Sequence, residues 1–381
     1  MDFSWTDEQV ALRKSVVEFA QRELNDDLIA RDADSIFSRD LWDKCAAFGI
    51  QGMPFPVDNG GQGADTVTTI LALEALGYGC RDNGLLFSIN AHMWSAAMPI
   101  WRFGSDDQKE RYLKGLCDGT LIGVQGMTEP GSGSDAFGMT TTARLDGDRY
   151  ILNGSKTFIT NAPVADVFVV FASLDRKKGW AGLSAFLVDR GTPGLVIGKP
   201  FHKMGLRTSP MSDLFFTDCE VPIENVLGRP GSGMMIFQHS IEWERSCILA
   251  NAIGSLEWHL EASIGYARQR EQFDQPISRF QAVSHRLVDM KVRLEAGRLL
   301  LYRLGWLRDN DQSTPLDAAM VKLFLSENFV ASSLDALQTH GGYGYLTETG
   351  LEREVRDAIA SRIYSGTSDI QRNVMARQMG L

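Results

Sequence analysis

Residues 125–135 read Q-G-M-T-E-P-G-S-G-S-D, from Gln125 to Asp135. Glycine and hydroxyl side chains crowd together in this stretch. Glycine lets backbone N–H groups approach an electron-rich ligand closely, and hydroxyl groups donate hydrogen bonds to it. By itself the stretch is also typical of a tight surface turn. Its interpretation therefore depends on the chain to either side.

The chain around and after this stretch has the texture of a β domain, from about residue 122 to residue 229. The dipeptides Asp146-Gly147 and Asn153-Gly154 bracket a short apolar run and predict hairpin turns. Further strands are predicted at residues 167–172, 183–188, 195–197 and 214–217. Because no helical segment separates these strands, the pattern favours an antiparallel barrel or sandwich.

The segment before residue 122 is helical. Apolar residues from Val10 to Leu28 recur at spacings of seven, three, four and four, which places them on one face of a helix. Thr6 and Gln9 are spaced as in a capping box at the start of this helix. A second helical stretch is predicted from Asp65 to Gly77, after a glycine-rich interruption.

The helical pattern returns after Met234 and continues to the end of the chain. It forms four long segments near residues 234–270, 279–309, 315–340 and 351–379, which predict a four-helix bundle. The sequence thus predicts an α+β protein with three parts. These are an N-terminal α-helical domain at 1–121, a middle antiparallel β-barrel or sandwich domain at 122–229 and a C-terminal bundle at 230–381.

Composition excludes several classes of function. The formal charge of -10 argues against nucleic acid as the main partner, because phosphate binding needs clustered cations. Five scattered cysteines form no CxxC pair, so neither a disulfide framework nor a zinc site is expected. The N-terminus lacks the pattern of a signal peptide, and no apolar run approaches the roughly 20 residues that span a bilayer. A soluble, cytoplasmic protein is expected.

Common catalytic motifs are also missing. The six histidines are dispersed outside any HExxH pattern, so no metal site is predicted. The sequence contains no GxxxxGK[ST] phosphate loop, no GxSxG elbow and no Rossmann GxGxxG. A nucleotide cofactor would have to be held in another way.

Five motifs occur in the order typical of the acyl-CoA dehydrogenase superfamily. They are TEPGSGSD at 128–135, FITN at 158–161, REQF at 270–273, QTHGGYG at 338–344 and IYSGTSDIQ at 363–371. The sequence resembles this superfamily over essentially its whole length, with Asp274 where a glycine is usual. The resemblance implies the helix, β-domain, helix fold, FAD as cofactor and dehydrogenation of an acyl thioester.

The resemblance also implies which residues bind FAD. Thr128 and Thr160 would hydrogen-bond the isoalloxazine ring, Phe158 would pack against it, and Ser134 would lie where flavin and thioester meet. The adenine-diphosphate end would be held, partly across a subunit interface, by Arg270, Phe273, Gln338, Gly342, Thr367 and Asp369. Further cofactor contacts are predicted at Met127, Gly133, Gly341 and Ser365.

The reaction needs a base for the proton alpha to the thioester carbonyl, and a buried carboxylate suits this role. Many members of the superfamily carry a Glu in the Y-E-G-T-S segment, whereas this sequence has Ser365 there. Glu244 is the candidate, because some branches carry their catalytic Glu immediately before the residue that matches Arg245. Glu242 is the fallback. Ser134, Arg245, Tyr364 and Ser365 are predicted to contact substrate.

The combination of Trp243-Glu244-Arg245 with residues 365–369 resembles one branch in particular, the dehydrogenases of L-prolyl groups on peptidyl carrier proteins. We therefore expect oxidation of an acyl or aminoacyl thioester, bound to a carrier protein or to CoA. Two alternatives stay open at this point, a short branched-chain acyl-CoA dehydrogenase and a flavin monooxygenase of the same fold. A non-catalytic carrier-binding protein is a third interpretation.

The motifs at residues 270–273 and 338–344 also imply an assembly, since in this superfamily they reach the flavin of a neighbouring chain. A homotetramer is expected. The electron acceptor would be an electron-transfer flavoprotein or oxygen. Lys199, His202, Lys203 and Arg207 form a basic cluster that suits a CoA phosphate or an acidic carrier protein, and equally a solvated loop.

Overall fold

The computed structural model describes residues 4–381, so residues 1–3 of the predicted N-terminal domain lie outside it. The first group of elements is helical and comprises α1 (Asp7–Glu23), α2 (Leu28–Asp34), α3 (Arg39–Phe48), α4 (Thr66–Gly79), α5 (Asn83–Ala91), the π-helix η2 (His92–Ala97), α6 (Met98–Phe103) and α7 (Asp106–Cys117). The predicted capping box is confirmed, because Thr6 and Gln9 exchange side-chain to backbone hydrogen bonds at the start of α1.

The second group is a β sheet. It comprises β1 (Gly123–Gly126), β2 (Thr142–Asp146), β3 (Arg149–Thr160), β4 (Val167–Ser173), β5 (Leu183–Asp189), β6 (Leu195–Ile197), β7 (Met211–Pro222) and β8 (Val226–Leu227). The strands follow the order β6-β7-β3-β2-β4-β5-β8, mostly antiparallel, and β1 pairs with β4 in parallel. The loop that follows β1 and the loop that follows β4 therefore leave the sheet at the same end.

One predicted turn is wrong. Asp146-Gly147 does join β2 to β3 in a tight hairpin, but Asn153-Gly154 lies inside β3. There the register against β7 shifts between Leu152 and Gly154, and Gly154 has a φ of 146°. Asn153 exchanges hydrogen bonds with Asp218 of β7, so the dipeptide forms a bulge in a long strand.

The third group is helical again and includes a small hairpin. It comprises α8 (Gly233–Cys247), α9 (Ala250–Gln269), β9 (Glu271–Gln272), β10 (Gln275–Pro276), α10 (Gln281–Asp309), α11 (Pro315–His340), α12 (Leu351–Ala360) and α13 (Ser368–Gln378). Two predicted helices are thus interrupted. The first breaks at residues 248–249, and the last breaks at residues 361–367, where Ser365 and Gly366 have φ values of 53° and 87°.

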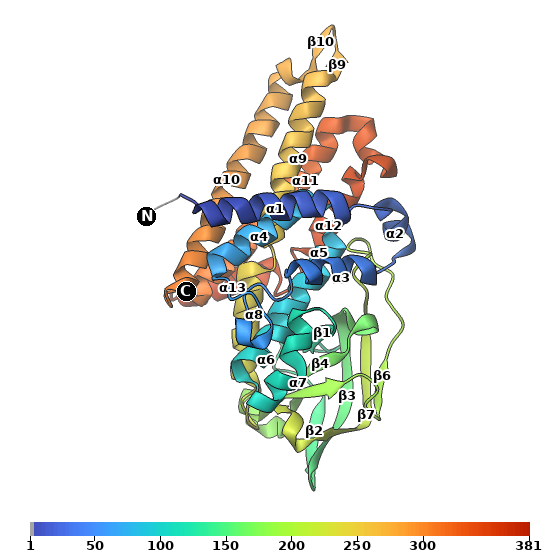
Figure 1. Ribbon diagram of the computed structural model, residues 1–381, viewed down its shortest axis with the longest axis vertical. Helices are drawn as coiled ribbons and strands as arrows, with labels where there is room; N and C mark the ends of the chain where they lie inside the picture. Colours follow the sequence, from blue (N-terminus) through green and yellow to red (C-terminus); the bar gives the residue numbers. More distant parts are fainter. Residues whose placement is uncertain (1–3) are drawn as a thin grey trace.

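The arrangement in space separates the sheet from the hairpin. Figure 1 shows α9 and α10 running together away from the sheet, with β9 and β10 at their far end. A hydrophobic cluster continues from the N-terminal helices through the sheet into α8, α9, α10 and α11. Within residues 4–381, none of the helices is both long and apolar enough to cross a membrane. The division at residues 121 and 229 stays a prediction.

Candidate active site

Helix α8 carries Glu244 and Arg245, and its neighbours hold it firmly. The guanidinium of Arg308 lies 4.3 Å from the centre of the Trp243 ring and donates a 2.8 Å hydrogen bond to the Glu242 carbonyl. On its other side the Trp243 ring stacks on Trp94 of η2, with 5.6 Å between centroids. The backbone at residue 244 is therefore clamped between α10 and the N-terminal helices.

The Glu244 carboxylate meets a hydroxyl from a distant part of the chain. Ser365 Oγ donates a 2.8 Å hydrogen bond to Glu244 Oε2. Burial raises the pKa of Glu244 to about 7, while the Ser365 hydrogen bond and the neighbouring Arg245 cation oppose that rise. A carboxylate that titrates near neutral pH is suited to taking up a proton. The structure thus brings together two residues that the sequence singled out separately.

The loop at residues 361–367 positions that hydroxyl, and a buried lysine holds the loop. Lys322 of α11 donates 2.8 Å hydrogen bonds to the carbonyls of Ser361 and Gly366. Gln371 of α13 donates to the carbonyls of Ser365 (3.1 Å) and Gly366 (2.8 Å). Burial, followed by the nearby Arg245 cation, lowers the pKa of Lys322 to about 7.

Sequence reasoning missed Lys322. Its one signal in the sequence is a lysine among apolar neighbours, in Val321-Lys322-Leu323-Phe324. That pattern is also typical of a lysine whose stem covers apolar surface while its ammonium reaches solvent. Only the fold shows that the ammonium is buried against a loop 39–44 residues away.

Tyr364 contributes an aromatic wall beside the same loop. Its ring lies 4.5 Å from that of Phe87 on α5, centroid to centroid, and Lys322 Nζ lies 5.7 Å from its centre. Burial raises the pKa of the Tyr364 hydroxyl well above its usual range, so the hydroxyl stays neutral. A direct contact of Tyr364 with substrate remains a prediction.

The loop after β1 is held by a buried ion pair. Glu129 accepts hydrogen bonds from the Lys156 ammonium (2.8 Å), the Thr141 N–H (3.0 Å) and the Thr140 hydroxyl (2.7 Å). Although burial alone would raise it, the pKa of Glu129 falls to about 2 because of Lys156 and these hydrogen bonds. Ser132 and Glu129 also exchange two 3.0 Å backbone hydrogen bonds.

This anchoring leaves the outer part of the loop free for a ligand. Gly133 and Ser134 are exposed, and a Cβ built on Gly133 would meet no atom within 4 Å. Met127 is buried beneath the loop, and its carbonyl accepts a hydrogen bond from Lys156. The backbone of Gly133 and the side chain of Ser134 are therefore accessible to a ligand.

The second flavin motif lies directly against the first. The Thr157 N–H donates a 2.9 Å hydrogen bond to the Thr128 carbonyl. Phe158 has a φ of 58° and a side chain that is 61% exposed, and Thr160 is half-buried two residues later. An exposed aromatic ring can pack against a flavin ring, and the hydroxyls of Thr128 and Thr160 can hydrogen-bond to it.

The residues predicted for the adenine-diphosphate end form two groups. Arg270 and Phe273 lie at the β9–β10 hairpin, and Gln338, Gly341 and Gly342 lie at the end of α11, all exposed. These two segments adjoin, because the ring of Tyr266 on α9 lies 4.3 Å from that of His340 on α11. Thr367 and Asp369 lie elsewhere, at the start of α13, where the Thr367 hydroxyl caps the helix by accepting from the Ile370 N–H.

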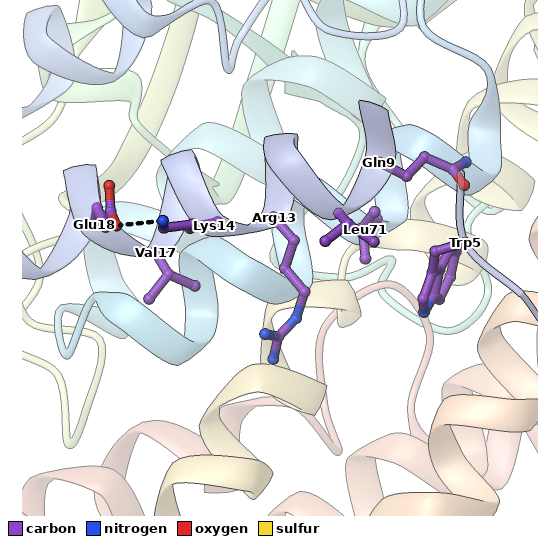
Figure 2. A pocket seen from close by; sticks show the side chains of 8 residues that line it. Trp5, Gln9, Arg13, Lys14, Val17, Glu18 and Leu71 are labelled. Carbon is purple, nitrogen blue, oxygen red and sulfur yellow. Dashed lines mark ion pairs between the residues drawn. The ribbon is translucent and has the colours of Figure 1, made fainter. Parts of the chain in front are cut away.

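A surface hollow of about 310 Å³ lies apart from all of these residues. Figure 2 shows its lining, which comprises Trp5, Gln9, Val10, Arg13, Lys14, Val17, Glu18 and Leu71. Within the hollow Lys14 Nζ lies 3.8 Å from a carboxylate oxygen of Glu18. No residue predicted for the active site lines it, so this hollow is not part of the candidate site.

Comparison with known proteins bears on the whole chain. Models of the acyl-CoA dehydrogenase N-terminal, middle and C-terminal domains match residues 6–120, 125–219 and 231–380. The chain is 44% identical to the L-prolyl-(peptidyl-carrier protein) dehydrogenase of Serratia sp. over 381 residues, which cover 100% of this chain and 99% of that protein. It is 40% identical to the protein of that name from Pseudomonas fluorescens, over the full length of both.

Solved structures are also similar to this chain over nearly its whole length. The crystal structure of the prolyl acyl carrier protein oxidase AnaB superposes with a TM-score of 0.98 at 50% identity, covering 99% of this chain and 100% of that one. The structure of PigA with FAD and proline superposes with a TM-score of 0.98 at 43% identity, over 100% of both chains.

Proposed function

The chain belongs to the acyl-CoA dehydrogenase family, and from this premise we propose that it oxidises an L-prolyl thioester carried on a peptidyl carrier protein. It is an FAD-dependent oxidoreductase. The observation that carries the proposal is the Glu244–Ser365 pair, in which the raised pKa of Glu244 leaves a base ready at neutral pH. The names of the relatives supply the prolyl group and the carrier.

In the proposed mechanism Glu244 takes up the proton from the carbon alpha to the thioester carbonyl. FAD, when bound, supplies the acceptor for the hydride that leaves the beta carbon. The Ser365 hydroxyl orients the carboxylate, and Lys322 and Gln371 orient Ser365 by holding its loop. Arg245 Nε donates a 3.4 Å hydrogen bond to the Ser365 carbonyl, which joins the base-bearing helix to that loop.

For the cofactor we propose two sets of contacts. Met127, Thr128, Gly133, Ser134, Phe158, Thr160 and Ser365 would surround the flavin ring, and Thr367 and Asp369 would meet the part beyond it. Arg270, Phe273, Gln338, Gly341 and Gly342 would serve the flavin of a neighbouring chain. This division is supported by Figure 1, where the β9–β10 hairpin lies far from the sheet, which carries Phe158 and Thr160 and from which the loop at 127–135 emerges.

The partners follow from the same proposal. A homotetramer would bring the hairpin of one chain to the flavin site of another. The electron acceptor would be an electron-transfer flavoprotein or oxygen, and the protein would act in the cytoplasm.

The test is anaerobic reduction of the flavin by substrate alone. Prolyl-loaded carrier protein should bleach the absorbance near 450 nm, and Glu244→Gln should slow bleaching by about 10²–10⁴-fold, the usual contribution of a positioned base. Glu242→Gln is the matched control, because it makes the same substitution two residues earlier on α8. It should retain the wild-type rate within a few-fold.

Each result has a distinct meaning. Bleaching by isovaleryl-CoA, with none by the carrier, would replace the proposal with branched-chain acyl-CoA oxidation. Absence of bleaching by either compound would favour the monooxygenase alternative. A Glu244→Gln variant that keeps the wild-type rate would refute the assignment of the base.

A further inference from the structure

The proposed mechanism assigns no role to a basic loop between β4 and β5. Its segment η4 (Arg176–Gly182) begins with Arg176-Lys177-Lys178 and also contains Trp180. All four side chains are exposed, and the Trp180 side chain is 60% exposed. Across residues 4–381, no carboxylate lies within ion-pair distance of any of the three cations. In a chain with a formal charge of -10, this run is a local concentration of positive charge.

The loop is closed and well defined. The Leu174 N–H donates a 2.8 Å hydrogen bond to the Gly182 carbonyl across its base. Asp175 accepts a 3.0 Å hydrogen bond from the Lys177 N–H, which fixes the first turn. A Cβ on Gly182 would lie 2.2 Å from the Asp175 carbonyl oxygen, so the two ends of the loop touch. The cations therefore lie on a loop whose two ends are joined.

This loop contacts α8, the helix that carries Glu244. Because β1 and β4 are parallel, it leaves the sheet at the same end as the loop at 127–135. The Ser173 N–H also donates a 2.9 Å hydrogen bond to the carbonyl of Thr141, which directly precedes β2. On its other side, Gly231 donates a 2.8 Å hydrogen bond to Ser184 Oγ just before α8 starts at Gly233. Glu244 follows eleven residues later, about 16 Å along the helix axis.

We propose that Arg176, Lys177, Lys178 and Trp180 form a docking surface for the acidic face of a peptidyl carrier protein. The phosphopantetheine arm of the docked carrier then spans the length of α8 to present its thioester at Glu244. This inference rests on the proposed function. Unpaired cations overcome the repulsion between two acidic proteins and speed their encounter, and an exposed tryptophan supplies apolar contact at the centre of the surface.

The other basic cluster is less suited to this role. Lys203 donates 2.5 Å hydrogen bonds to the carbonyls of Leu206 and Ser209, and Arg207 donates to the Lys203 carbonyl. Burial lowers the pKa of Lys203 to about 8. Two of the four cations that the sequence grouped there thus serve their own loop, whereas those of the basic loop are free.

The test compares a carrier-bound substrate with a carrier-free one. Arg176→Glu/Lys178→Glu should raise KM for prolyl-loaded carrier protein by about tenfold or more at low salt. Trp180→Ala should also raise it. Neither change should alter the KM for prolyl-pantetheine, a thioester without the protein, or kcat for either substrate. Lys14→Glu/Arg22→Glu on α1 makes the same change in charge on another surface and should leave both KM values unchanged.

Two results would overturn the docking surface. One is an unchanged KM for the carrier in the double variant, and the other is an equal rise in KM for the carrier and for prolyl-pantetheine. If wild type oxidised no prolyl thioester, the proposed function would fail on its own. Docking would then be measured as salt-sensitive binding of phosphopantetheinylated carrier protein by anisotropy. Loss of that binding in Arg176→Glu/Lys178→Glu, but not in Lys14→Glu/Arg22→Glu, would support the surface. Equal binding by wild type and by Arg176→Glu/Lys178→Glu would refute it, and so would absence of binding by wild type.

Discussion

At the level of single residues, the contact between Glu244 and Ser365 explains an unusual feature of the sequence. The position where many members of the family carry a catalytic Glu holds a serine here, and its hydroxyl lies 2.8 Å from the Glu244 carboxylate. The Glu244 carboxylate on α8 thus lies in hydrogen-bond contact with the side chain at position 365 of the loop at 361–367. Under the proposed mechanism, Glu244 would take the place of that loop Glu, from a position 121 residues away in the sequence.

The pH dependence of flavin reduction should report this pair. Because the pKa of Glu244 is raised to about 7, the reactive carboxylate forms as pH rises, and the rate should reach half its maximum near pH 7. The Ser365 hydrogen bond lowers that pKa, so Ser365→Ala should shift the profile to higher pH. Stopped-flow reduction from pH 5.5 to pH 9 measures both, and an identical profile in the two proteins would contradict the role of Ser365.

At the level of elements, one ion pair anchors the loop at 127–135. Glu129 and Lys156 are both buried, at 4% and 0% exposure, and they join this loop to β3. Burial lowers the pKa of Lys156 to about 8 against the attraction of Glu129, so the pair is held at a cost in hydration. The loop at 127–135 is therefore anchored at its base, and Gly133 and Ser134 near its tip are exposed.

Removal of one partner should be much worse than removal of both. Lys156→Met leaves Glu129 without its cation and should destabilise the protein by about 3 kcal/mol, as is usual for broken buried pairs. Glu129→Gln/Lys156→Met should recover part of this loss. Urea denaturation of the two variants measures the difference.

The same pair gives a prediction about acid. Because the folded-state pKa of Glu129 is lowered to about 2, its stabilisation is complete above the unfolded value of 4.5 and is lost as pH falls toward 2. In Lys156→Met the carboxyl group can instead protonate at mildly acidic pH. The loss of stability should thus be smaller at pH 4 than at pH 7, and an equal loss at both would argue against a charge effect.

At the level of the whole molecule, apolar side chains are exposed at the end farthest from the sheet. Phe273 at the hairpin tip is 86% exposed, and Tyr345 near the end of α11 is 81% exposed. Exposed apolar residues gathered at one end favour an interface with another chain. In Figure 1 this end comprises the β9–β10 hairpin together with the neighbouring ends of α9 and α10.

Replacement of Phe273 should separate assembly from folding. Its φ of 54° is a conformation that asparagine tolerates better than phenylalanine, so Phe273→Asn should leave the hairpin intact. Loss of the ring should weaken FAD retention by about tenfold or more and yield smaller species. Light scattering and the ratio of flavin to protein absorbance measure this, and a variant with wild-type mass and flavin content would count against the shared site.

Much of the protein could be predicted from its sequence, because many features depend on near neighbours. The capping box of Thr6 and Gln9, the turn at Asp146-Gly147 and the order of helical and β-rich regions each follow from residues a few positions apart. The family motifs and the serine at position 365 are likewise visible in the sequence, as is the candidate Glu244.

Tertiary structure decided the features that depend on distant neighbours. Pairing with β7 kept Asn153-Gly154 inside a strand, although the dipeptide by itself is typical of a turn. Folding buries Lys322 against the loop at 361–367, where its ammonium donates hydrogen bonds to two carbonyls, whereas the lysines of the basic loop are exposed. Sequence named Glu244 and Ser365 as separate candidates, but only packing of α8 against that loop placed their side chains in contact, because burial and long-range contacts arise only when the chain is folded.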